Sequence, residues 1–200
     1  MSLDTYANLK TEIADFLDRD DLTSQIDTFI DLTEARHKRE VRVREMMTRA
    51  AVTVNARQIS LPTGYLQMIT FRLLTDPVTV LTELNYHEMN RNRTGNGKPT
   101  LFAVANEIEF DKSPDSSYSG EMVYFKSQTA LSDSNTTNDI LTNYPDLYLY
   151  GSLLAAEPFL MNDARIQTWA ALYKSALDAA NEMTNKKGGP LISRVSGAVY

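Results

Sequence analysis

Apolar residues recur at helical spacing near the start of the chain. Residues three and four positions apart share one face of a helix, and here they are Tyr6, Leu9, Ile13, Phe16 and Leu17. Thr5 stands directly before them, where its hydroxyl can accept a hydrogen bond from a free backbone amide. These features predict a first helix over residues 5–17. A second run with the same period predicts another helix over residues 25–40.

The pattern changes between residues 41 and 127, where β-branched residues become common. Short apolar runs alternate there with turn residues, for example at residues 61–64 and 113–117. This alternation predicts several short strands that form a small antiparallel sheet. Residues 93–99 contain two glycines and are expected to form a mobile loop.

Helical spacing returns towards the C-terminus. Pro145 suits the first turn of a helix, because its missing amide costs nothing there, and we expect this helix over residues 144–161. Its residues are apolar on almost every side, which requires cover from several directions. Two interpretations stay open, a central core helix and a subunit contact, and the first is favoured. A last helix is expected over residues 163–185, before the Gly-Gly-Pro sequence at 188–190.

Together these elements predict an α+β fold. We expect a bundle of about four helices, with a β-rich insertion over residues 41–127 between the second and third helices. The length of 200 residues is ordinary for one domain, so residues 1–187 are predicted to form a single domain. Residues 188–200 would then form an extended C-terminal tail.

Composition narrows the class of protein. Hydrophobic residues make up 42% of the chain and charged residues 23%, which is typical of a soluble globular protein. There is no cysteine, which excludes disulfides, thiolate metal sites and cysteine nucleophiles. The first residues lack the pattern of a signal peptide, and the most apolar segment is too short to span a bilayer. We therefore expect a soluble protein, made in a cytoplasm, with no membrane partner.

The net charge of −6 hides an uneven distribution. Residues 1–35 hold nine acidic and two basic residues, whereas residues 36–57 hold seven basic and two acidic ones. Complementary blocks of this kind suit a contact between copies of one chain. The predicted inter-subunit contact residues are Asp15, Asp18 and Asp21 on one side and Arg36, Arg39, Arg42 and Arg44 on the other.

The sequence offers no start for catalysis or cofactor binding. His37 and His87 are far apart, without the spacing of metal ligands, and are expected at the surface or in an interface. A phosphate-binding loop around Gly97 would need glycine at position 92 and serine or threonine at 99, where Asn92 and Pro99 stand. We therefore predict no catalytic residue, no cofactor, no metal and no enzymatic activity.

Several segments, in this order, resemble the head-to-tail adaptors of short-tailed bacteriophages. The similar segments are residues 5–9, 29–36, 42–46, 61–62, 141–151, 156–160 and Trp169, and the strongest is Leu141-Thr-Asn-Tyr-Pro-Asp-Leu-Tyr-Leu-Tyr-Gly151. The resemblance covers most of residues 1–187. These motifs are structural, and none contains a catalytic residue.

The resemblance implies a helical bundle with a β-rich insertion and a mechanical role in the virion. About twelve copies would form a ring beneath the portal protein and join it to the tail nozzle and tail fibre proteins. Double-stranded DNA would pass through the bore without specific binding, which suits an acidic chain. Such a protein is located in the neck or tail and made in the cytoplasm of the host bacterium.

The resemblance also implies that the C-terminal segment reaches the portal. The predicted portal contact residues are Leu191, Ile192, Val195, Val199 and Tyr200, in an extended segment suited to adding a strand to a partner's sheet. Two alternatives remain: a neck connector ring of a long-tailed phage, and a DNA-binding module that uses the basic residues 36–49. The basic segment lacks the interleaved aromatic residues of single-strand binders, which favours a solvated or interface face.

Overall fold

The computed structural model describes residues 3–19, 21–160 and 163–185. Contacts group these residues into two compact units. The helical unit contains the described residues up to 45 and from 129 onwards, and the β unit contains residues 46–128. The β unit is therefore an insertion in the sequence of the helical unit.

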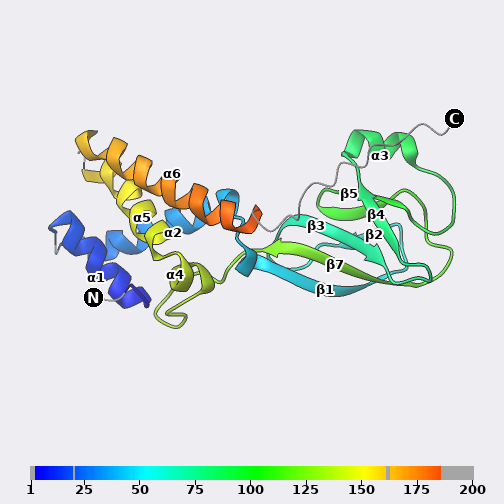
Figure 1. Cartoon of the computed structure of the whole chain (residues 1–200), viewed down its shortest axis with the longest axis horizontal. Helices are drawn as coiled ribbons and strands as arrows, with labels where there is room; N and C mark the ends of the chain where they lie inside the picture. Colours follow the sequence, from blue (N-terminus) through cyan, green and yellow to red (C-terminus); the bar gives the residue numbers. More distant parts are fainter. Residues whose placement is uncertain (1–2, 20, 161–162, 186–200) are drawn as a thin grey trace, which may run out of the picture. The chain divides into compact units, whose positions relative to one another are not determined.

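The helical unit is built around one central helix (Figure 1). Its elements are α1 (Tyr6–Leu17), α2 (Thr23–Glu40), α4 (Asp139–Asn143), α5 (Pro145–Leu160) and α6 (Asp163–Asn185). Helix α5 packs against the other four, and its apolar side chains, among them Leu147 and Leu153, are buried. This confirms the interpretation of the apolar segment as a core helix. Gly151 lets α2 approach closely, because a Cβ atom there would lie 2.5 Å from Thr33 Cγ2.

Local capping explains where α1 begins and ends. The Thr5 hydroxyl accepts a hydrogen bond from the Asn8 amide at 3.3 Å, as the sequence predicted. At the other end, Asp18 adopts a left-handed conformation with φ of 53°. Aspartate tolerates this conformation better than most residues, although glycine has no such cost.

A buried polar cluster attaches the returning chain to the helices. Glu34 Oε1 accepts hydrogen bonds from the Leu131 amide at 2.7 Å and from the Tyr148 hydroxyl at 3.0 Å. Asn138 donates to the Tyr148 hydroxyl at 2.7 Å and accepts from the Leu141 amide as the N-cap of α4. The segment that follows the β unit is thus fixed to both α2 and α5.

The β unit contains a seven-stranded, curled sheet (Figure 1). Its strands are β1 (Met47–Val54), β2 (Gln58–Ser60), β3 (Tyr65–Leu73), β4 (Thr79–Glu83), β5 (Leu101–Val104), β6 (Glu107–Phe110) and β7 (Tyr118–Lys126), in the order β1-β7-β3-β4-β5-β6-β2. Neighbours are antiparallel except β4 and β5, which are parallel. Helix α3 (Tyr86–Asn92) lies in the connection between those two strands. The core of the unit includes Phe71, Phe102 and Phe110.

The predicted fold, a bundle of about four helices with a small antiparallel sheet, is wrong. The described residues form six α-helices and a mixed sheet of seven strands. Pairing such as Met47 with Phe125 joins residues far apart in the sequence, and local periodicity does not reveal it. Helix α4 has five residues, too few to show a helical period, and lies in a segment that reads as a polar loop.

The glycine-containing loop after α3 differs from the mobile loop expected from the sequence. The Thr94 amide donates to Asp111 O at 2.9 Å, and the Gly97 amide donates to Ser113 O at 2.9 Å. Arg57 Nη2 donates to Thr94 O at 2.6 Å. These bonds hold the loop against the segment that follows β6.

In the described ranges, no helix combines the length and apolar character needed to cross a membrane.

Candidate functional site

The charged residues predicted to make inter-subunit contacts lie at two ends of the helical unit. We call the residues Asp15, Asp18 and Asp21, at the connection from α1 to α2, the acidic end. We call the residues Arg36, Arg39, Arg42 and Arg44, at and after the C-terminal turns of α2, the basic end. Helix α2, which connects the two ends, has 18 residues and is therefore about 27 Å long at 1.5 Å per residue.

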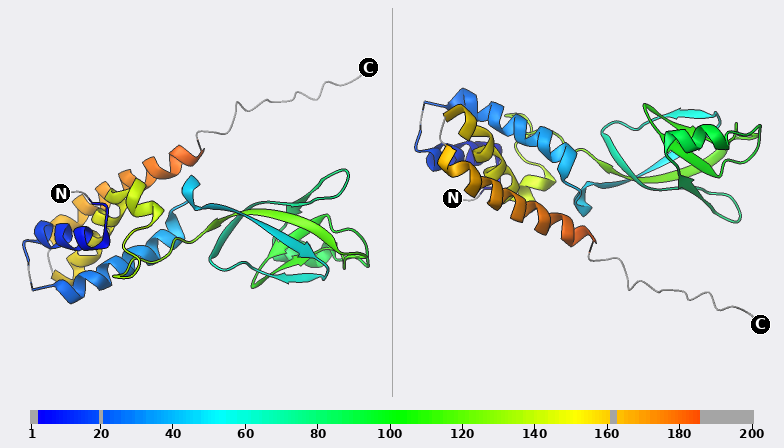
Figure 2. Two further views of the ribbon diagram at one scale, coloured as in Figure 1. Left: turned by 90° about the horizontal axis from the view of Figure 1, so that it is seen from below. Right: turned by 90° about the horizontal axis from the view of Figure 1, so that it is seen from above.

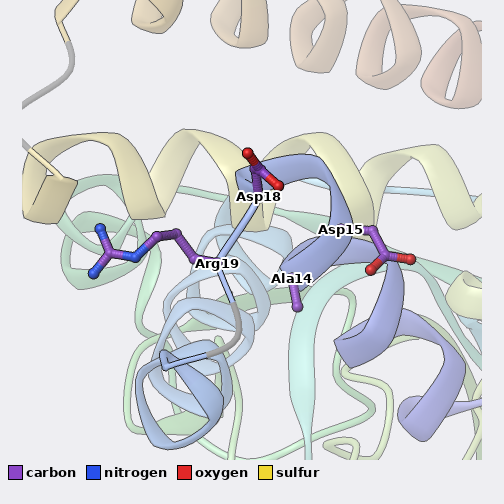
Figure 3. Close-up of a pocket in the computed structure, with 4 residues that line it drawn as sticks. All are labelled: Ala14, Asp15, Asp18 and Arg19. Carbon is purple, nitrogen blue, oxygen red and sulfur yellow. The ribbon is translucent and has the colours of Figure 1, made fainter.

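The acidic end forms an open depression and not a ligand site. Ala14, Asp15, Asp18 and Arg19 line it, with a volume of about 370 Å³. Their charged groups point in different directions and do not converge on one point (Figure 3). Among the described residues, no group of three carboxylate or histidine side chains is placed to hold a metal ion.

Helix stability does not explain the acidic residues at the end of α1. The C-terminus of a helix carries a partial negative charge, so an exposed acidic residue there costs about 0.3–1 kcal/mol. Asp15 lies in the last turn of α1 and Asp18 is its C-cap, and both are exposed. An unfavourable local placement of this kind is consistent with a role in contacting another molecule.

Asp21 is already paired within the chain. Arg19 donates from Nε to Asp21 Oδ1 at 2.6 Å and from Nη2 to Oδ2 at 2.7 Å. These hydrogen bonds hold the pKa of Asp21 below its usual value. Of the three predicted acidic contact residues, Asp21 is therefore less available to a second molecule than Asp15 and Asp18.

Two arginines of the basic end are part of the fold. Arg42 Nη1 donates to Val41 O at 2.7 Å and to Lys38 O at 3.1 Å, which satisfies carbonyls at the end of α2. Its backbone amide donates to Asn181 Oδ1 at 2.8 Å and so joins α2 to α6. The guanidinium of Arg36 lies over the Tyr173 ring, 5.3 Å from its centroid.

The other two arginines are exposed. Arg39 lies in the last turn of α2, and Arg44 has a side chain that is 62% exposed. Arg44 Nη2 lies 3.3 Å from Glu45 Oε1, in an exposed pair of small energetic value. Arg39 and Arg44 are therefore the best placed residues of this set to reach a second molecule.

The prediction that His37 is a surface or interface residue is wrong. Its side chain is 3% exposed and lies between the rings of Tyr148 and Tyr173, at centroid distances of 4.8 and 6.3 Å. Burial lowers the pKa of His37 to about 4, and the nearby charge of Arg36 acts in the same direction. The signal was in the sequence, because His37 continues the helical period of Ile30 and Thr33. His87 is exposed.

The predicted portal contact residues, Leu191, Ile192, Val195, Val199 and Tyr200, lie outside the described residues. A family model described as "SU10 adaptor protein" matches residues 4–194, which covers both units. No curated protein matches the chain. The chain therefore belongs to the SU10 adaptor protein family, which confirms its resemblance to phage head-to-tail adaptors.

Proposed function

We propose that this SU10 adaptor family member is a non-enzymatic ring subunit of a phage virion. About twelve copies join the portal protein to the tail nozzle and fibre proteins, and the bore of the ring continues the DNA channel. The protein is made in the host cytoplasm and located in the neck of the virion. The family match over residues 4–194 is the observation that carries this proposal.

The two ends of the helical unit supply a contact for the ring. A ring needs two different surfaces on each copy, because every subunit meets its neighbour head to tail. The acidic end of one copy, through Asp15 and Asp18, meets the basic end of the next, through Arg39 and Arg44. Such exposed charges guide the approach and fix the register more than they add affinity.

Internal contacts of the basic segment favour passage of DNA over specific binding. Arg36 lies on Tyr173, and Arg42 binds backbone carbonyls at the end of α2. Cations engaged in this way are poorly placed to replace the counterions of a DNA backbone. Together with the net charge of −6, this favours a channel component over a DNA-binding module.

The C-terminal segment is the proposed portal contact, through Leu191, Ile192, Val195, Val199 and Tyr200. Deletion of residues 188–200 should abolish portal binding and leave the two units folded. Co-sedimentation with portal rings measures the binding, and circular dichroism measures the fold. Portal binding by the shortened chain would contradict this role.

Electron microscopy tests the proposed function directly. The purified full-length chain is imaged alone and after mixing with portal rings from the same phage, at several salt concentrations. A ring stacked on one end of the portal is the expected result. The proposal fails if neither a ring nor a portal complex forms under any of these conditions, and duplex DNA binding then becomes the function to test.

A further inference from the structure

The loop after α3 contains an asparagine that is followed directly by glycine. Asn96-Gly97 is the one pair of this kind in the sequence. It lies in residues 93–99, which follow α3, and α3 packs against β5 (Figure 2). Asn96 is exposed, and Gly97 has no Cβ atom to shield its backbone nitrogen from the side chain before it. The sequence therefore marks Asn96 as a residue that can lose its side-chain amide.

The chemistry of this loss is an attack by Gly97 N on Asn96 Cγ. A bond forms between these two atoms, the bond from Cγ to Nδ2 breaks, and Nδ2 leaves as ammonia with the proton of the Gly97 amide. The cyclic imide that results takes up one water molecule from the solvent. Opening at Cγ gives aspartate, and opening at the backbone carbonyl of residue 96 gives isoaspartate. Either product adds a negative charge to the β unit.

The fold holds the attacking nitrogen in an unreactive state. The Gly97 amide donates a hydrogen bond to Ser113 O at 2.9 Å, and the Ser113 amide donates to Gly95 O at 3.1 Å. Asn96 and Ser113 form a parallel bridge. The nitrogen must give up its proton to attack, and the bond to Ser113 O retains that proton. We propose that Asn96 is a deamidation site that reacts only when this loop opens, so that the Ser113 contact sets its rate.

Arg57 gives a second hold on the same loop. Its Nη2 donates to Thr94 O at 2.6 Å and to Gly95 O at 3.4 Å. The Thr94 amide also donates to Asp111 O at 2.9 Å. Segments held by exposed hydrogen bonds open locally, at a lower cost than unfolding of the whole domain. A substitution at Arg57 should therefore loosen the loop while the β unit stays folded.

Mass spectrometry of the full chain measures the reaction. The chain is incubated at neutral pH and digested with trypsin, and the peptide over residues 94–112 is compared with a synthetic peptide of the same sequence. The folded chain should deamidate more slowly than the free peptide, by about tenfold or more. Equal rates in the two would overturn the proposal. Asn96→Gln is the control for position, because product that still forms in this variant comes from another residue.

Hydrogen exchange of the Gly97 amide, followed by nuclear magnetic resonance of the ¹⁵N-labelled chain, gives the sharpest comparison. Exchange and deamidation both require release of this amide from Ser113 O, so one opening governs both. The factor by which the fold slows deamidation should equal the factor by which it slows exchange. Fast deamidation in a chain whose Gly97 amide is protected contradicts the proposal.

Substitutions then change the opening itself. Arg57→Gln should raise both rates by about three- to tenfold. Arg44→Gln should change neither, because Arg44 is an exposed arginine of the helical unit. Low urea concentrations, well below the unfolding midpoint, open the loop without any substitution. A condition that speeds exchange at Gly97 but leaves deamidation unchanged overturns the proposal, and none of these measurements requires a ring.

Discussion

Substitution of Gly151 by alanine should loosen the contact between α2 and α5. The added Cβ would lie 2.5 Å from Thr33 Cγ2 and 3.3 Å from Tyr173 Cε2, well inside the 3.5–4.0 Å of a normal carbon contact. Either the two helices separate or Thr33 rotates. Rotation would break the hydrogen bond from Thr33 Oγ1 to Phe29 O, which is 2.8 Å long.

The expected loss of stability combines three effects. Overpacking a well-packed core costs about 1–3 kcal/mol, and the loss of one hydrogen bond costs about 1 kcal/mol. Alanine in place of glycine within a helix returns about 1 kcal/mol. Gly151→Ala should therefore lower the free energy of unfolding of the helical unit by about 1–3 kcal/mol.

Urea unfolding followed by tryptophan fluorescence measures this change. Trp169 is the single tryptophan and lies in α6, so its signal reports on the helical unit. Thr33→Ser removes the clashing Cγ2 and keeps the hydroxyl, so Gly151→Ala should cost much less in that background. An equal cost in the wild-type and Thr33→Ser backgrounds would refute the close contact as the cause.

Three further predictions concern charge. Arg39→Glu with Arg44→Glu should weaken ring formation in sedimentation experiments, and adding Asp15→Arg with Asp18→Arg should restore it; rings of unchanged stability in the first variant count against the contact. Asp18→Gly should raise the free energy of unfolding by about 1 kcal/mol, because glycine adopts the left-handed conformation without steric cost and the substitution removes a negative charge at a helix C-terminus. A lower urea midpoint contradicts this. Because burial lowers the pKa of His37 to about 4, below the 6.5 of the unfolded chain, its contribution to stability is present above pH 6.5. That contribution, on the order of 3 kcal/mol, is lost as pH falls from 6.5 to 4, and His37→Gln should show a smaller loss over this range in pH-dependent urea unfolding; equal losses in both proteins argue against it.

Local patterns in the sequence locate the helices better than they locate the sheet. Helix α1 spans Tyr6–Leu17, close to the predicted 5–17, because its apolar spacing and its Thr5 cap lie within one short segment. The parallel pairing of β4 with β5 depends on Thr82 meeting Leu101 across the connection that contains α3. No periodicity within either strand specifies that partner, so the sequence understates the size of the sheet.

The candidate site shows the same limit at the level of side chains. The sequence shows the blocks of charge, but it does not show which arginines make contacts within the fold. Arg42 satisfies carbonyls at the end of α2 and Arg36 lies on Tyr173, whereas Arg39 is exposed. The contact of Arg36 depends on α6, which carries Tyr173 and lies beside the end of α2 only in the folded chain.

The polar groups that hold the helical unit together are buried, whereas those proposed to meet a neighbouring copy are exposed. Substitutions can therefore change the proposed assembly without disrupting the fold. Glu34, Tyr148 and Asn138 hold the returning chain through hydrogen bonds inside the helical unit. A buried network of this kind is costly to break, since each unpaired group loses its partner without gaining water. Arg39 and Arg44 take no part in it and lie at the surface. Charge reversal at these two positions should therefore change how copies meet, while the free energy of unfolding of the subunit falls by only about 1–2 kcal/mol, because Arg39→Glu exchanges a favourable for an unfavourable charge in the last turn of α2.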